Sequence, residues 1–165
     1  MTALGPIEAA AFLYREALLL DRLDFDPWLA LYTNDCVFWM PAWRDDGTQT
    51  EDPDRELSLI FYRGRRNLED RVKRIRSGFS VASNEMPRVS HMIGNVLSEQ
   101  VDETTMRLDS SFIVNVQHVR INRTHAYFGR YEHELRLVDG EWKIARKVIR
   151  LMNDVVPTML DVYGI

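Results

Sequence analysis

The chain has 165 residues, a formal net charge of −4 and a single cysteine, Cys36. A chain of this length fits one domain that needs no metal or disulfide to fold, since folding buries roughly 70% of its unfolded surface. One cysteine excludes an internal disulfide and any zinc or iron–sulfur site that needs two thiolates from this chain. We expect the charge to be spread along the chain, so the net charge by itself predicts no class of partner.

Residues 6–23 have apolar side chains at helical spacing, which predicts an amphipathic helix. The predicted buried stripe contains Ile7, Ala11, Tyr14 and Leu18. Glu16 is expected elsewhere around the helix. Charged residues interrupt this stretch and no basic region precedes it, which argues against a signal peptide or a membrane span. We therefore expect a soluble, cytoplasmic protein.

Asp26 and Pro27 predict the start of a short helix, which we expect to end near Asn34. Residues 36–40, CVFWM, are β-branched and aromatic enough to predict a buried strand. From 41 to 56 the sequence becomes acidic and contains two prolines and a glycine. Such a long surface loop is typical of functional or interfacial segments.

Residues 57–62, LSLIFY, predict a further strand or the lead-in to a helix. Asn67 is expected to cap a helix. The predicted buried stripe of that helix contains Leu68, Val72 and Ile75. Residues 77–88 then predict a second loop.

Residues 89–101 and 104–119 alternate in polarity and predict two long strands joined near Asp102. Counting outward from that turn places Ile93 opposite Phe112, Leu97 opposite Leu108 and Asn95 opposite Ser110. This register gathers the apolar groups on one face, and a slip of one residue would turn them outward. The dipeptide 122–123 predicts the next turn.

Asp139 and Gly140 form the strongest local signal in the chain, a two-residue type I′ hairpin turn. Counting outward from that turn gives an apolar and a charged face. The pairs expected on the apolar face are Leu135 with Ile144, His133 with Arg146 and Tyr131 with Val148; Glu132 with Lys147 is expected on the charged face. Helices followed by a meander of long antiparallel strands predict a single α+β domain over residues 1–165.

None of the four histidines has the close spacing of a metal site, so the sequence predicts no metal here. Acidic residues interrupt the basic run at 63–76, which argues against nucleic-acid binding. Trp43 lies in the acidic segment, where an amphipathic ring suits an interface.

The polar residues around His133 also have an enzymatic interpretation. His133 would be a general base in a pocket with Tyr131 and Arg146, and Asp109 or Asp35 would orient it. The alternative is that these groups hydrogen-bond to one another or to a partner chain. We favour the second interpretation, because buried polar groups are normally paired for structural reasons. An open cavity would favour catalysis, and a cavity filled by Trp142, Phe112 and Tyr131 would favour structure.

Five segments of the chain resemble the small (β) subunits of bacterial aromatic-ring-hydroxylating dioxygenases, most closely those of the benzoate, toluate and anthranilate 1,2-dioxygenase group. They are FLYREALLLD (12–21), VFWMPAW (37–43), TEDPDRELSLIFY (50–62), LEDRVKRIR (68–76) and SHMIGNV (90–96). The resemblance covers nearly the whole chain. It implies a nuclear transport factor 2-like fold, in which N-terminal helices pack on a curved antiparallel sheet to form a cone.

The resemblance also implies a role. A larger α subunit of an α3β3 complex would carry the Rieske [2Fe–2S] cluster and a mononuclear Fe(II), and a reductase would supply electrons from NADH. The complex would cis-dihydroxylate an aromatic carboxylate such as benzoate or anthranilate. The β subunit would be structural, with no catalytic, cofactor or metal residues of its own. The residues expected at subunit contacts are Trp43, Arg65, Arg66 and Arg71. The alternative is a stand-alone, cofactor-free lyase or isomerase that uses His133.

Overall fold

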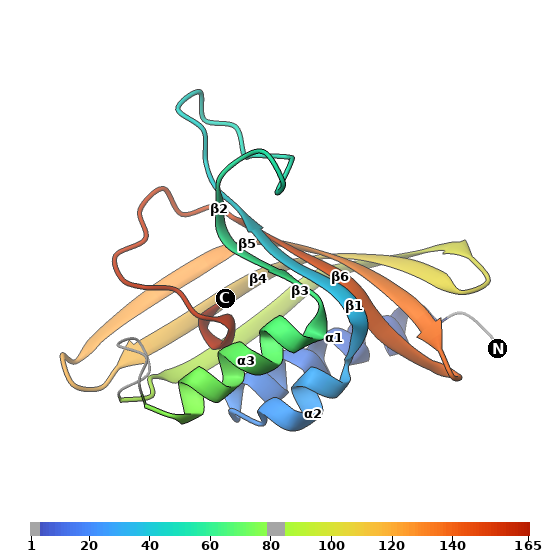
Figure 1. Ribbon diagram of the computed structural model, residues 1–165, viewed down its shortest axis with the longest axis horizontal. Helices are drawn as coiled ribbons and strands as arrows, with labels where there is room; N and C mark the ends of the chain where they lie inside the picture. The colour runs from blue at the N-terminus through green and yellow to red at the C-terminus, as the bar shows by residue number, and fades with distance from the viewer. Residues whose placement is uncertain (1–3, 79–84) are drawn as a thin grey trace.

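The computed structural model describes residues 4–78 and 85–165 (Figure 1). Its elements, in chain order, are α1 (Pro6–Asp21), α2 (Phe25–Ala30), β1 (Tyr32–Pro41), β2 (Ser58–Arg63), α3 (Arg65–Arg76), β3 (Arg88–Asp102), β4 (Thr105–His118), β5 (Arg123–Val138), β6 (Glu141–Leu151) and the 3₁₀ helix η2 (Val162–Gly164). Part of the loop predicted at 77–88 lies outside the described residues.

The six strands form one sheet in the order β2-β1-β6-β5-β4-β3. Neighbouring strands are antiparallel except β1 and β6, which are parallel. Figure 1 shows the three α-helices together on one side of the curved sheet, with η2 close to them. The predicted α+β architecture, helices packed on a curved sheet, is therefore confirmed. No described helix has the length and apolar character needed to cross a membrane.

The buried face of α1 differs from the predicted stripe. Ile7 is 85% exposed, and Tyr14 and Leu18 are also exposed. The buried residues of the helix are Ala9, Leu13, Glu16, Ala17 and Leu20. Apolar residues occur on both faces of this helix, so spacing alone could not choose between them. The face that contains a carboxylate is the buried one, because the sheet supplies a cation for it.

The helices α2 and α3 form where they were predicted, but their ends differ. The N-cap of α2 is Asp24 rather than Asp26, and the helix ends at Ala30 rather than near Asn34. The strand β1 contains the whole predicted strand 36–40. The predicted stripe of α3 is buried. Its N-cap is Gly64, with φ 83°, and not Asn67. Asn67 lies in the first turn instead, and its Nδ2 donates a hydrogen bond to the Arg63 carbonyl at 2.6 Å.

The hairpin between β5 and β6 has the predicted turn. Asp139 and Gly140 have φ of 51° and 81°, as a type I′ turn requires. Val138 pairs with Glu141, and Leu135 pairs with Ile144. The predicted register is thus confirmed over the first part of the hairpin.

A β-bulge shifts the rest of this hairpin by one residue. The shift lies between Glu134 and Leu135, and it places His133 opposite Lys147 rather than Arg146. A bulge inserts one unpaired residue and reverses which side chains face inward beyond it. Lys147 is consequently buried and Arg146 exposed, the opposite of the prediction. Likewise Tyr131 pairs with Ile149, not Val148.

A second bulge interrupts the pairing of β3 with β4. Ile93 pairs with Phe112 as predicted, but beyond Gly94 the register shifts and Leu97 pairs with Asp109. Leu97 is 72% exposed as a result. Asn95 adopts φ 52°, and its Nδ2 donates to Ser111 Oγ at 3.2 Å rather than contacting Ser110.

Candidate functional site

Four polar side chains from α1, β1, β5 and β6 meet in the interior. Glu16 is the common acceptor: its Oε1 lies 2.8 Å from Lys147 Nζ and 2.6 Å from the Tyr32 hydroxyl, which donates to it. Its Oε2 lies 3.0 Å from His133 Nε2. Each of the four residues is at most 3% exposed. We call these four residues the buried polar cluster.

The charges of the buried polar cluster follow from its geometry. Burial by itself raises the pKa of Glu16, but the charge of Lys147, together with the hydrogen bonds from His133 and Lys147, outweighs burial and holds this pKa well below its usual range. Burial lowers the pKa of His133, so its ring is neutral at pH 7. A neutral ring that donates from Nε2 leaves Nδ1 as an acceptor, and His133 Nδ1 has no hydrogen-bond partner within residues 4–78 and 85–165. Burial also raises the pKa of Tyr32 well above its usual value.

Aromatic rings surround the buried polar cluster. The Tyr131 ring stacks on Phe112 with centroids 4.1 Å apart, and Lys147 Nζ lies 4.3 Å from the Tyr131 centroid. Phe112 and Tyr131 are each 2% exposed. The cluster therefore stabilises a charge pair between α1 and the sheet, and solvent does not reach it.

The residues expected for an enzyme pocket come together only in part. His133, Arg146 and Asp109 line one cavity of about 150 Å³, but the His133 side chain is buried and its Nε2 is bonded to Glu16. Arg146 lies on the outer face of the sheet, over the Trp39 ring at 5.7 Å. Asp109 is exposed, and Asp35 pairs with Arg136 at 2.9 Å. The carboxylate that reaches His133 is Glu16, which was expected away from the buried stripe of α1. Glu16 shares a helical face with Leu13 and Leu20, but the face with Tyr14 and Leu18 is also apolar, so spacing alone did not single it out.

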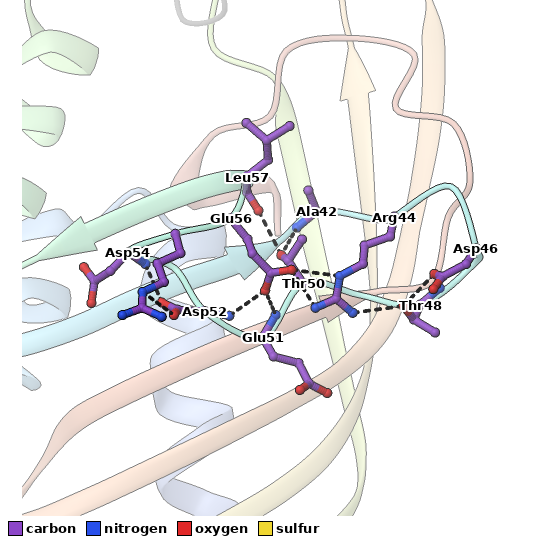
Figure 2. Close-up of polar contacts among 11 residues, drawn as sticks. Ala42, Arg44, Asp46, Thr48, Thr50, Glu51, Asp52, Asp54, Glu56 and Leu57 are labelled. Atoms are coloured by element: carbon purple, nitrogen blue, oxygen red, sulfur yellow. Dashed lines mark hydrogen bonds and ion pairs between the residues drawn. The ribbon is translucent and has the colours of Figure 1, made fainter.

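A second organised region is the acidic loop, residues 42–57, between β1 and β2 (Figure 2). Glu56 holds it together. Its Oε1 accepts from Arg44 Nε at 2.8 Å, and its Oε2 accepts from the backbone N–H groups of Glu51 and Asp52 at 2.7 and 2.9 Å. These two backbone hydrogen bonds, followed by Arg44, lower the pKa of Glu56 to about 2.

Two further side chains tie the acidic loop to itself and to the sheet. Thr50 Oγ1 accepts from the Ala42 N–H at 3.1 Å and donates to the Leu57 carbonyl at 2.8 Å. Gln49 Nε2 donates to the Leu151 carbonyl at 2.8 Å. The loop is thus a defined structure, although its side chains are mostly solvated. Trp43 forms an isolated antiparallel β-bridge with Gln49 through the backbone, and the residue is 40% exposed.

Glu56→Ala is expected to loosen the acidic loop while leaving the domain folded. Without the carboxylate, two backbone N–H groups and Arg44 lose their acceptor, so the amides of Glu51 and Asp52 should exchange with solvent faster. Hydrogen exchange read by NMR measures this change. In the wild type the same loosening should appear as pH falls from about 4.5 toward about 2, because Glu56 then becomes protonated. Unchanged exchange in the variant would contradict this role of Glu56.

The basic helix α3 is largely paired within the chain. Arg65 pairs with Glu69 at 3.1 Å, and Arg71 Nε donates to Asp161 Oδ1 at 2.9 Å. Asp161 is 3% exposed, so its ion pair fixes the C-terminal segment on α3. Arg66, in contrast, is exposed and has no ion-pair partner among the described residues. Of the four residues predicted at subunit contacts, Trp43 and Arg66 are the most accessible.

Metal ligands do not gather in the described part of the chain. Within residues 4–78 and 85–165, no three His, Cys, Asp or Glu side chains are placed to hold a metal ion together. Cys36 is fully buried, and burial raises the pKa of its thiol to about 11. This cysteine is thus a core residue with little thiolate character at neutral pH.

Comparison with known proteins identifies the family. Residues 15–158 match the family described as "Ring hydroxylating beta subunit". The chain belongs to this family. Among its relatives, the small subunit of 2-halobenzoate 1,2-dioxygenase from Burkholderia cepacia is 38% identical, over 96% of this chain and 95% of its own length. The benzoate 1,2-dioxygenase β subunit of Acinetobacter baylyi is 36% identical, over 96% and 92%.

A solved β-subunit structure has the same fold. The benzoate 1,2-dioxygenase β subunit from Burkholderia mallei superposes with a TM-score of 0.81 and 34% identity, and each chain covers the other completely. The resemblance found in the sequence is thereby confirmed, and so is the nuclear transport factor 2-like fold. As a ring-hydroxylating β subunit, the chain is a non-catalytic subunit of an oxygenase, which agrees with a sealed polar cluster in its interior.

Proposed function

We propose that this β subunit holds the catalytic α subunits of an aromatic-ring-hydroxylating dioxygenase together in an α3β3 complex. The observation that carries the proposal is the end-to-end match to a benzoate dioxygenase β subunit. The interior supports it as well, because the side chains of His133 and Glu16 are buried and bonded to each other, which joins α1 to the sheet. The contacts to other subunits would include Trp43 and Arg66, with Arg65 and Arg71 beside them.

The oxidative chemistry belongs to the partner. The α subunit would hold the Rieske [2Fe–2S] cluster and the mononuclear Fe(II), and a reductase in the same cytoplasm would supply electrons from NADH. A Rieske centre needs two cysteines and two histidines. This chain has one cysteine, and it is buried in the core, so its residues do not fit that cluster. No step of the oxidation is therefore assigned to the β subunit.

The substrate class follows from the relatives. Three of the relatives are named for 2-halobenzoate, benzoate and anthranilate. All three are aromatic carboxylates. We therefore assign the complex to the cis-dihydroxylation of an aromatic carboxylate, with the choice among such acids made in the α subunit.

Reconstitution tests the proposal. The α subunit expressed without this chain is expected to fail to form the stable complex and to oxidise benzoate poorly. Adding the purified β subunit should restore both assembly, measured by light scattering, and product formation in the presence of reductase and NADH. An α subunit that is equally assembled and equally active without the β subunit would overturn the proposal.

A further inference from the structure

One segment of the chain is strongly acidic. The acidic loop contains six acidic residues and two arginines, which gives it a net charge of −4. The charge is therefore not distributed evenly along the chain, although residues outside this loop and α3 also sum to −4. Glu56 fixes the loop, so the negative field has a defined position (Figure 2).

The helix α3 has the opposite charge. It contains six basic and two acidic residues, a net charge of +4. Asp26 and Asp161 offset part of it through their ion pairs with Arg76 and Arg71. Arg66 and Arg74 remain, both exposed and without an ion-pair partner among the described residues. In the acidic loop Asp45, Asp46 and Glu51 likewise form no ion pair with any described residue.

The two charged regions lie in different parts of the fold but approach each other at one point. The six residues of β2 separate the end of the acidic loop from the start of α3 along the chain. Asp54 of the loop pairs with Arg63, at the end of β2, at 3.0 Å. Figure 1 shows the rest of the loop projecting beyond the top of the sheet, while α3 lies below it with the other helices.

We infer that the acidic loop of one β subunit binds α3 of a second copy. Every copy presents both surfaces, a negative loop and a positive helix face, so charge complementarity favours another copy of this chain as the partner. Contacts between two different surfaces run head to tail and close into a ring when the rotation allows it. Trp43 supplies an exposed aromatic anchor at the edge of the loop. The inference deepens the proposed function, since it names the surfaces by which β subunits contact one another.

Charge reversal tests the contact. The loop variant Asp45→Arg/Glu51→Arg and the helix variant Arg66→Glu/Arg74→Glu are each expected to weaken self-association of the purified chain about tenfold or more. Each variant removes the net charge of its segment, and like charges then meet at the altered positions. Sedimentation equilibrium at low salt measures the association constant. Combining all four substitutions in one chain should restore it, since the surfaces are again complementary. Higher salt should weaken the wild-type contact.

A mixture provides a second measurement that does not depend on the quadruple variant. The arginine-bearing loop variant and the glutamate-bearing helix variant each associate poorly alone, but mixed together they should form heterodimers. The matched control is Glu99→Arg/Glu103→Arg, which reverses two exposed carboxylates near the β3–β4 turn and should leave association unchanged. A wild-type chain that stays monomeric, a control as damaging as the loop variant, or a mixture that does not associate would overturn the inference.

Binding to the α subunit, measured on the same samples, separates the two proposals. If the wild-type chain binds α and reversal leaves contacts between β subunits intact, the inference fails and the proposed function stands. If no variant and no wild-type chain binds α, the proposed function fails, whereas sedimentation of the chain alone still decides the contact between copies.

Discussion

Lys147→Ala should lower the free energy of unfolding by about 3–5 kcal/mol, because it leaves the Glu16 carboxylate buried without its cation. Chemical denaturation of the purified β subunit measures this loss. The matched control is Lys143→Ala, which removes a surface pair with Glu141 at 3.6 Å and should cost less than about 1 kcal/mol. A loss in Lys147→Ala no larger than in the control would contradict the assigned role of the buried pair.

The pH dependence of stability should also differ between the wild type and Lys147→Ala. In the wild type the folded pKa of Glu16 lies well below its ordinary value of 4.5. Its contribution is therefore present above about pH 4.5 and is lost as the pH falls further. In the variant, burial dominates and raises this pKa in the folded state, so acidification should recover part of the lost stability.

The double variant Glu16→Leu/Lys147→Met should be more stable than Lys147→Ala, because it leaves no unpaired charge in the interior.

Gly129→Ala should be the second large effect. A Cβ at this position would lie 2.0 Å from the Arg150 carbonyl oxygen and 3.2 Å from Leu151 Cα, so the clash is with the backbone of β6. Side-chain rotation cannot relieve it, and we expect a loss of about 3 kcal/mol. For a domain of this size that lowers Tm by about 6–12 °C. Thermal unfolding followed by circular dichroism measures the shift.

Gly94→Ala is the control for Gly129→Ala. A Cβ at Gly94 would meet no atom within 4 Å, so its effect on stability should stay within about 1 kcal/mol. Equal effects at the two glycines would contradict the close approach of β5 to β6. The comparison also tests the register beyond the bulge, because Gly129 pairs with Leu151 only in the shifted alignment.

Local signals in the sequence predicted the parts of the fold that depend on local chemistry. The turn at Asp139 and Gly140 and the buried stripe of α3 are examples, since both depend on residues close in sequence. The positions of the β-bulges, in contrast, are not indicated by any local pattern in the sequence. One extra residue near Ala145 exchanges the positions of Arg146 and Lys147, and this exchange decides which cation reaches Glu16.

The acidic loop shows the same limit at the level of the site. Its length and composition predicted an exposed, functional segment, and Trp43 was singled out within it. The hydrogen bonds from Glu51 and Asp52 to the Glu56 side chain depend on the backbone path, which no spacing of residue types specifies. Its strongly negative charge, in contrast, was present in the sequence and needed only to be counted by segment.

Native mass spectrometry of the purified oxygenase, combined with iron analysis of the separated subunits, tests the central claim most directly. The structural role of the β subunit predicts equal numbers of α and β subunits, three of each, with all of the iron in the α fraction. A complex that lacks this chain, or iron that remains bound to the isolated β subunit, would contradict it.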